Sequence, residues 1–295
     1  MMLSLSRHDP VLAIAIQQRN FWHIAQRVGI YVVLVVGGIL FITPWLFMAS
    51  TSLKTLGEAT ALPPVWIPAI PQFSNFTEPF QKVEFGRFYL NSILVTVVSI
   101  AGVILSCTPV AYAFARIPFR GRRTLFVLVL ATMFLPDQVT LIPMYVFFAK
   151  LGWVNTFLPL LVPRFFAVDA FIVFLMRQFF MGIPRELDDA CRIDGGGHLT
   201  ILTRILLPLC GPMLGVVLIL QFVNYWNDFF WPLVFLSSME NFTVSLGLRL
   251  FQSQFLVQTH LVMAMAFLAT LPTIILFFIA QRTFIQGIVL TGANR

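Results

Sequence analysis

The sequence predicts an all-α, polytopic membrane protein with about six transmembrane helices. Only 11% of its 295 residues are charged, whereas a soluble domain carries about 25%. Hydrophobic residues make up 59% of the chain, which is more apolar surface than so few polar residues cover in water. The apolar residues form long continuous runs rather than short alternating ones, which favours helices over the strands of a membrane barrel.

Six runs are long enough to cross a hydrocarbon core, which takes roughly 20 helical residues. In chain order the predicted spans are 30–50, 92–114, 125–148, 158–180, 213–235 and 261–280. A helix is expected for each, because it satisfies its own backbone hydrogen bonds in lipid. Prolines inside the runs predict kinks or breaks, at Pro44, Pro109, Pro136, Pro143 and Pro272.

Lysines and arginines set the orientation of these spans. Thirteen of the nineteen lie in the segments that an even number of spans places with the two termini, and this excess marks the cytoplasmic side. We therefore expect a cytoplasmic amino-terminal segment at 1–29, a membrane domain at 30–280 and a cytoplasmic tail at 281–295. Pro10 and Arg19 flank the only apolar run near the start, so no signal peptide is expected there.

The polar loop 181–212 faces the cytoplasm in this topology and predicts two short helices joined by a sharp turn. Pro184 suits the first turn of a helix, and the acids that follow favour the positive end of its dipole. Three glycines at 195–197 end that helix, because glycine reaches the positive φ of a tight reversal. A second helix is expected at about 198–207.

The first of these helices carries one modest apolar face, formed by Leu187, Ala190 and Cys191. Its two small side chains allow close packing in a groove, which favours a helix that docks on a cytoplasmic partner. The alternative is a solvated connector whose acids only aid solubility. The residues alone leave both interpretations open.

A family resemblance bears on this choice. The run Asp189-Ala-Cys-x-x-Asp194-Gly195, followed by Ile205-x-Leu207-Pro208, resembles the EAA motif of the membrane subunits of bacterial ABC importers. Three other stretches are similar to the carbohydrate-uptake permeases, in particular to the half related to the smaller maltose permease subunit: Gly182-Ile-Pro-Arg-Glu-Leu187, Trp226-Asn-Asp-Phe-Phe-Trp-Pro-Leu233 and Gln281-Arg-x-Phe-Ile-x-Gly287. The resemblance implies the type I permease fold of ABC importers.

It also implies that loop 181–212 is the coupling loop, whose helix docks in a groove of a cytoplasmic ATPase. Asp189 stands where the family has glutamate, Ala190 and Cys191 where it has two alanines, and Gly195 at its turn glycine. The chain departs from the family's pattern at Asp189, at Cys191, and at Gly196 where alanine is usual. The expected ATPase-docking residues are Glu186, Asp189, Ala190, Cys191, Asp194 and Gly195.

The partners implied are a second, similar permease subunit, two copies of the ABC ATPase, an extracytoplasmic solute-binding protein and the lipid of a bacterial inner membrane. ATP is expected on the ATPase, because this chain has no GxxxxGK[ST] phosphate loop, and no cofactor is expected here. No HExxH, GxSxG or CxxC motif occurs and the four histidines are far apart, which argues against an enzyme, a metal site or a disulfide framework. Scattered basic residues argue against nucleic acid.

Polar residues within the spans are candidates for the transport pathway, because such groups are costly in lipid and usually face a cavity or a partner. The expected pathway residues are Asp137, Gln138, Asn224, Trp226, Asn227 and Asp228. Amides and carboxylates pair with sugar hydroxyls, and aromatic rings pack on sugar C–H faces. Alternatively, Trp226 belongs to an interfacial aromatic belt, and Asn227 and Asp228 only cap a broken helix.

Arg164 and Asp169 add charges to the fourth span, although Arg164 lies at the outer interface if that span begins near Phe165.

Taken with the family resemblance, these features predict a permease subunit for ATP-driven carbohydrate uptake. The alternatives are an importer of glycerol phosphate, polyamines or another small solute, and an ATP-independent carrier or a membrane scaffold.

Overall fold

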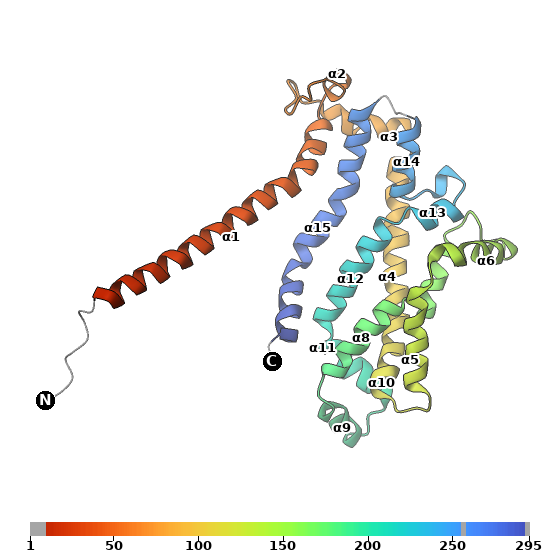
Figure 1. The fold of residues 1–295 in the computed structure, drawn as a ribbon. Coiled ribbons are helices and arrows are strands. Elements are labelled where there is room, and N and C mark those ends of the chain that lie inside the picture. The colour runs from red at the N-terminus through yellow and green to blue at the C-terminus, as the bar shows by residue number, and fades with distance from the viewer. Residues whose placement is uncertain (1–9, 255–257, 293–295) are drawn as a thin grey trace.

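The computed structural model describes residues 10–254 and 258–292, with side chains at 26–81, 83–136, 138–249 and 258–280. The described part is a bundle of helices without strands, in agreement with the predicted all-α class (Figure 1). Four helices are long and apolar enough to cross a membrane, and two bent pairs bring the number to six if each pair counts as one span.

Helix α4 (Phe85–Arg116) runs through the centre of the bundle. It packs against α8 (Ala170–Gly182), α12 (Gly211–Trp226) and the 3₁₀ segment η3 (Val162–Phe166). Val103, Cys107 and Ala111 repeat every four residues along α4 and are fully buried in the main core. Side chains of this size let the neighbouring backbones approach closely, which is how helices associate where lipid supplies no hydrophobic drive.

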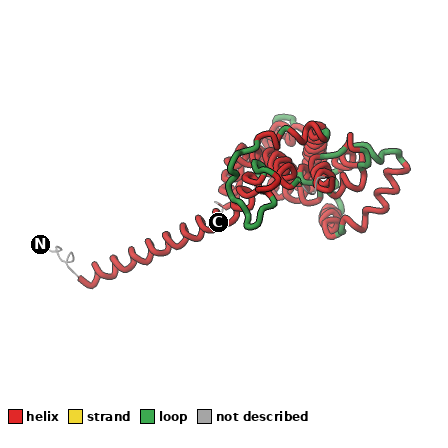
Figure 2. The backbone as a smooth tube through the Cα atoms, turned by 90° about the horizontal axis from the view of Figure 1, so that it is seen from above, coloured by secondary structure: helices red, strands yellow, loops and turns green. Residues whose placement is uncertain are grey.

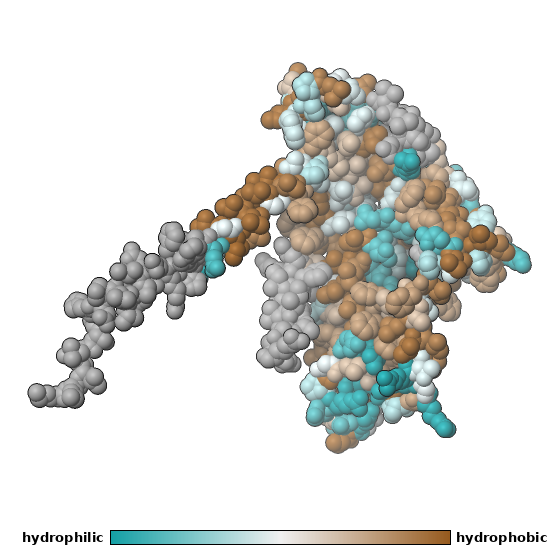
Figure 3. All heavy atoms as spheres, viewed as in Figure 1, coloured by the Kyte–Doolittle hydropathy of each residue, from teal (hydrophilic) through white to brown (hydrophobic). Residues whose placement is uncertain are grey.

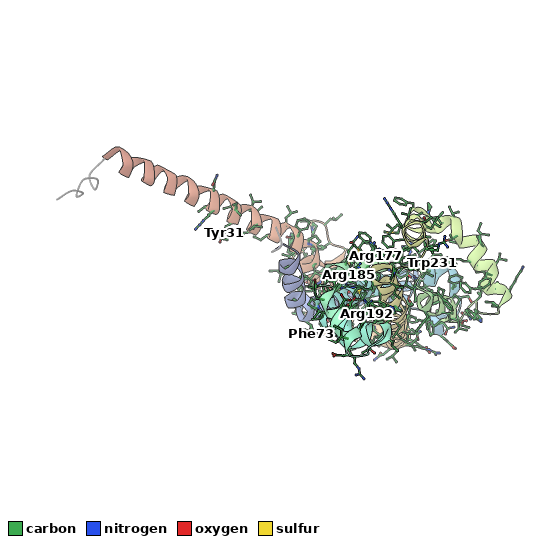
Figure 4. The ribbon with its side chains drawn as sticks, turned by 90° about the horizontal axis from the view of Figure 1, so that it is seen from below. Tyr31, Phe73, Arg177, Arg185, Arg192 and Trp231 are labelled. Atoms are coloured by element: carbon green, nitrogen blue, oxygen red, sulfur yellow. The ribbon has the colours of Figure 1, made fainter. Side chains whose placement is uncertain are left out.

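Helix α1 (Pro10–Thr51) contains the predicted span 30–50 and slants away from the bundle (Figures 1 and 2). Most of the apolar side chains between Val28 and Leu46 are exposed, as Tyr31 is (Figure 4). Attachment to the rest of the chain is near its carboxyl end, where the ring centroids of Trp45 and Phe267 lie 5.1 Å apart. Beyond it, the side-chain amide of Asn75 donates to the carbonyls of Ser52 and Lys54 at 2.9 and 2.8 Å.

The loop after α1 forms three short elements, α2 (Leu56–Ala59), η1 (Phe73–Phe76) and α3 (Glu78–Lys82). At the same end, η5 (Met239–Asn241) and α14 (Val244–Gln254) precede the last helix, α15 (Thr259–Gly292). Helix α15 lies beside α12 and α1 and contains the predicted span 261–280.

The predicted span 125–148 consists of two helices that meet at a bend. Helix α5 (Arg122–Ala131) and η2 (Thr132–Phe134) end at an extended Leu135, and α6 (Asp137–Lys150) leaves at 96°. Pro136 is the physical reason, because it disfavours the helical conformation in the residue before it. The break predicted at this proline is confirmed.

The predicted span 213–235 is also two elements. Helix α12 ends at Trp226, and α13 (Phe230–Phe235) begins after three non-helical residues. The span 158–180 corresponds to Leu158–Gly182, which comprises α7 (Leu158–Leu161), η3 and α8. Arg164 lies within η3, and the left-handed Ala167 (φ 52°) separates η3 from α8.

Candidate functional site

The predicted coupling loop forms the end of the bundle opposite α2 and α3 (Figure 1). Helix α9 (Glu186–Ile193) has all three of its acids in the first turn, where they stabilise the positive end of the helix dipole. It ends as predicted: Gly195 adopts φ +82°, and the Gly196 N–H donates to the Cys191 carbonyl at 2.7 Å. Figure 4 views the molecule from this end and labels Arg185 and Arg192, which lie at the start of α9 and within it.

The second helix of the loop is longer and less regular than predicted. It begins at His198 with α10 (His198–Thr200), continues as a π-helix η4 (Ile201–Leu206) and ends with α11 (Leu207–Leu209). A bend of 78° then separates it from α12. The loop is therefore continuous with a helix of the membrane bundle.

The outer face of α9 carries most of the predicted docking residues. Glu186, Asp189, Ala190, Asp194 and Gly195 are exposed. The Asp189 carboxylate accepts a hydrogen bond from the Arg192 guanidinium at 2.9 Å, but its side chain remains 65% exposed. These groups are thus accessible to a partner.

Cys191 lies on the opposite face. The predicted apolar face of Leu187, Ala190 and Cys191 is split, because Cys191 is buried against the rest of the chain while the other two are exposed. Exposed apolar surface is found instead at Ile193, which is 87% exposed, and at Leu199, which is 73% exposed. Neither residue is among the predicted docking residues, although each is a large aliphatic side chain beside a polar turn, which is a sequence signal for an exposed contact.

A buried ion pair attaches α9 to α4. The Arg116 Nε atom lies 3.4 Å from the Asp188 carboxylate, and the two side chains are only 2% and 4% exposed. Arg116 also donates to the Ile183 carbonyl at 2.7 Å. One turn earlier on α4, the Tyr112 hydroxyl lies 2.8 Å from His198 Nδ1, within hydrogen-bond distance. Two residues of α4 thus hold both helices of the loop.

None of these four residues was among the predicted site residues. The burial of Asp188 is seen only in the structure, because the composition of a short polar helix does not predict which of its acids is buried.

Gly196 and Cys191 are matched to each other. A Cβ at position 196 would lie far inside van der Waals distance of the Cys191 sulfur and 2.9 Å from the Cys191 carbonyl oxygen. The backbone of Gly196 has no positive φ, so the conflict is steric alone. The two departures from the family pattern at these positions are therefore one packing arrangement.

Four of the predicted pathway residues line one hollow of about 790 Å³: Gln138, Asn224, Asn227 and Asp228. Arg164 and Trp231 complete its polar and aromatic lining. Figure 3 shows hydrophilic atoms in this region, around α12 and α13, between apolar surfaces above and below. The break between α12 and α13 brings these groups to the surface at mid-height in the bundle.

The other two predicted pathway residues differ. Trp226 is buried, stacks on Phe222 with ring centroids 5.5 Å apart and donates from its indole nitrogen to the Ala269 carbonyl at 2.9 Å. It therefore joins α12 to α15 and does not line the hollow. Asp137 begins α6, and its side chain lies outside the described residues.

Asn227 and Asp228 also do what the capping alternative predicts. The Asn227 amide donates to the Val223 carbonyl at 2.9 Å, and Asp228 accepts from the Trp231 N–H at 3.2 Å. Both residues stabilise the break and line the hollow at the same time. Deeper in the bundle, Asp169 caps α8 through the Ile172 N–H and accepts from the Gln221 amide at 2.6 Å.

Among the described residues, no group of three His, Cys, Asp or Glu side chains is placed to hold a metal ion. Cys107, Cys191 and Cys210 are buried free thiols.

Residues 107–289, more than half of the chain, match the family of binding-protein-dependent transport system inner membrane components. The chain belongs to this family. Among its relatives is the arabinooligosaccharides transport system permease protein AraQ of Halalkalibacterium halodurans, 34% identical over 78% of this chain and 82% of that protein. Another is the melibiose/raffinose/stachyose import permease protein MelC of Bacillus subtilis, 31% identical over 83% of this chain and 88% of that protein.

A solved structure confirms the fold of this family member. The bacterial ABC transporter involved in the import of the acidic polysaccharide alginate has a chain that superposes with a TM-score of 0.76. The match covers 96% of this chain and 100% of that chain at 24% identity. The predicted permease fold of ABC importers is thus confirmed.

We predict that Asp188→Asn destabilises this permease strongly, because it leaves the Arg116 charge buried without its counter-ion. Loss of one partner of a buried pair costs about 3–5 kcal/mol. Asp189→Asn removes the same charge from the exposed pair with Arg192 and is the matched control, with an expected cost of about 0–1 kcal/mol. Thermal unfolding of the purified protein in detergent measures both. Equal melting temperatures of the two variants would contradict the role assigned to Asp188.

We also predict that Gly196→Ala destabilises the loop by overpacking, at about 1–3 kcal/mol. In a Cys191→Ala background the same substitution should cost less, because the sulfur is gone and only the close contact with the backbone carbonyl oxygen of residue 191 remains. A double-mutant cycle of melting temperatures measures this coupling. Gly197→Ala is the control, since no atom lies within 4 Å of a Cβ there. Additive effects of the two substitutions would show that Gly196 and Cys191 are independent.

Proposed function

We propose that this chain is the membrane-spanning subunit of an ATP-driven importer that carries a carbohydrate across the bacterial inner membrane. The observation that carries the proposal is the hollow at the break between α12 and α13. Its volume of about 790 Å³ falls in the usual range for ligand sites, about 300–1,000 Å³. Relatives that carry arabinooligosaccharides, melibiose, raffinose and stachyose by name support the solute class.

The lining of the hollow suits a neutral, hydroxyl-rich solute, because its two charged residues, Arg164 and Asp228, have opposite signs. The amides of Gln138, Asn224 and Asn227 each offer donors and an acceptor, and the Asp228 carboxylate offers acceptors. Trp231 and the two phenylalanines before it add aromatic surface for the C–H faces of a sugar ring. Asn224 is exposed, and its side-chain amide donates no hydrogen bond within the described part of the chain, so that amide is available to a solute.

The outer face of α9 is the proposed docking surface for the ATPase, with Asp189, Ile193 and Leu199 as its most accessible polar and apolar groups. A displacement of α9 reaches α4 directly, because Asp188 and His198 are attached to Arg116 and Tyr112. Helix α4 packs on α12, which ends at the hollow. The chain thus offers a mechanical path from a cytoplasmic contact to a site within the membrane.

We further propose the assembly that this path requires. A second permease subunit completes the pathway, two copies of the ATPase bind and hydrolyse ATP, and an extracytoplasmic binding protein delivers the solute. Both terminal segments and loop 181–212 lie in the cytoplasm in this arrangement. The positive-inside bias of the sequence supports it.

Uptake by the complete transporter in liposomes tests the solute class. ATP is supplied inside the liposomes in one experiment and outside them in another. The panel contains mono-, di- and oligosaccharides, glycerol phosphate and a polyamine. We expect uptake of a carbohydrate only when ATP is on the ATPase side, and Asn224→Ala should raise its half-saturating concentration about two- to tenfold through one lost hydrogen bond. The control is Gln72→Ala, which removes a side-chain amide from the segment between α2 and η1.

Preferred uptake of glycerol phosphate or the polyamine would replace the carbohydrate assignment. Uptake without any ATPase subunit would establish an ATP-independent carrier instead. Binding of the ATPase without transport of any solute in the panel would favour a scaffold.

The same liposomes test coupling through α9. Asp189→Lys reverses an exposed charge at the docking surface, and Gly195→Pro is incompatible with the φ of +82° at the turn. We expect both variants to insert normally and to lose ATP-dependent uptake. Gly197→Ala, at a glycine with φ −88°, should retain it. Wild-type uptake by both variants would exclude this docking surface.

A further inference from the structure

A second hollow lies close to the coupling loop and is lined by arginines. Its volume is about 600 Å³, and it is formed by the end of α4, the start of α5 and the loop before α9. Four of its eight lining residues are arginines, at positions 116, 122, 123 and 185. No acidic residue lines it. This hollow is separate from the one lined by Asn224 and Asn227, with which it shares no residue.

Most of the positive charge around this hollow has no internal counter-ion. Asp188 balances Arg116, and Arg122 donates to the uncharged Ile117 carbonyl at 3.4 Å. Arg122, Arg123 and Arg185 form no ion pair within the described part of the chain. Elsewhere in the described part of the chain, Arg87 is paired with Glu84 and Glu240 and Arg192 with Asp189, whereas the exposed residues Arg120 and Arg204 form no ion pair. Three uncompensated arginines around one hollow repel one another unless an anion lies between them.

The first turn of α5 adds to this positive potential. Helix α5 begins at Arg122 and has ten residues. Its N-cap is Gly121, which has no side chain to accept hydrogen bonds from the first N–H groups. Unpaired N–H groups and the helix dipole both favour an anion at this position. Gly121 and Thr124 themselves line the hollow, so the helix start faces it.

The surroundings of the hollow indicate an amphiphile rather than a soluble anion. The hollow lies where α4 ends and α5 begins, at the cytoplasmic ends of the apolar runs. Phe119 forms part of its wall and is 38% exposed. Immediately along α5, Leu125 and Leu128 are 48% and 57% exposed. Basic groups thus meet exposed apolar surface at one edge.

We propose that this hollow binds the phosphate of an anionic phospholipid on the cytoplasmic leaflet, with the acyl chains along α5. Guanidinium groups match phosphate oxygens in charge and in bidentate geometry, and basic pockets between transmembrane helices on this side bind anionic headgroups. The lipid is held beside the coupling loop, because Arg185 directly precedes α9. It is distinct from the docking surface for the ATPase, which is formed by the exposed outer face of α9.

The proposal is tested by the binding of fluorescently labelled phosphatidylglycerol. The chain is purified with the subunits that accompany it. The test variant is Arg123→Gln/Arg185→Gln, which removes two lining arginines. The matched control is Arg120→Gln/Arg204→Gln, which removes two exposed arginines that do not line the hollow. We expect the affinity to fall at least about fivefold in the test variant and less than about twofold in the control. Labelled phosphatidylcholine should bind equally to all three proteins.

A conservative variant separates binding from folding. Arg123→Lys/Arg185→Lys keeps both charges and should retain most of the affinity for phosphatidylglycerol. Three results would overturn the proposal. One is an equal loss of affinity in the test and control variants, or no loss in either. Another is complete displacement of the labelled lipid by millimolar inorganic phosphate, which would indicate a site for a soluble anion. The third is loss of the accompanying ATPase from the test variant with unchanged lipid affinity, which would assign the arginines to a protein partner.

Discussion

The ion pair between Arg116 and Asp188 joins loop 181–212 to the helix bundle. Removing two charges from water is expensive, and mutual attraction offsets that cost only where geometry and further hydrogen bonds are favourable. Here the Ile183 carbonyl supplies such a bond, and the Tyr112–His198 contact adds a second attachment one turn away. Because both attachments are on α4, the loop cannot move independently of the helix around which α8 and α12 pack. A loop joined to the bundle by its backbone ends alone would absorb a push without transmitting it.

The second constraint is the unsatisfied backbone at helix breaks. The interruption between α12 and α13 frees N–H and C=O groups at membrane depth, where lipid offers no partner. Asn227 and Asp228 satisfy two of these groups with their side chains and bring polar atoms to the wall of the hollow. Capping and solute contact are therefore compatible roles for the same two residues.

Local chemistry in the sequence predicted some of these features and missed others for a definite reason. The break at Pro136 was predictable because the missing N–H belongs to the proline itself. The end of α12 at Trp226 was expected only in the alternative in which Asn227 and Asp228 cap a broken helix, because 227–229 contains neither proline nor glycine. Contacts with distant segments hold that end: the Trp226 indole donates to Ala269, and Ser245 donates to the Trp226 carbonyl.

Loop 181–212 likewise has some features that the local sequence predicts and others that depend on distant contacts. Its helix, its glycine stop and its exposed acids followed from capping rules. The inward direction of Cys191 and the burial of Asp188 depend on α4, which is far away in the sequence. Likewise, polarity marks Gln138, Asn224, Asn227 and Asp228, which line one hollow, but it gives no sign that Trp226 packs against α15.

The packing of Gly196 on Cys191 restricts the order in which this loop could have diverged from a sequence with alanine at both positions. A cysteine at 191 opposite an alanine at 196 has no room for its sulfur, whereas a glycine at 196 opposite an alanine at 191 leaves only a small gap. The route through glycine is therefore open, and the route through cysteine passes a steric block. Once both changes are present, the glycine can revert only after the cysteine has, so the two positions change in a fixed order.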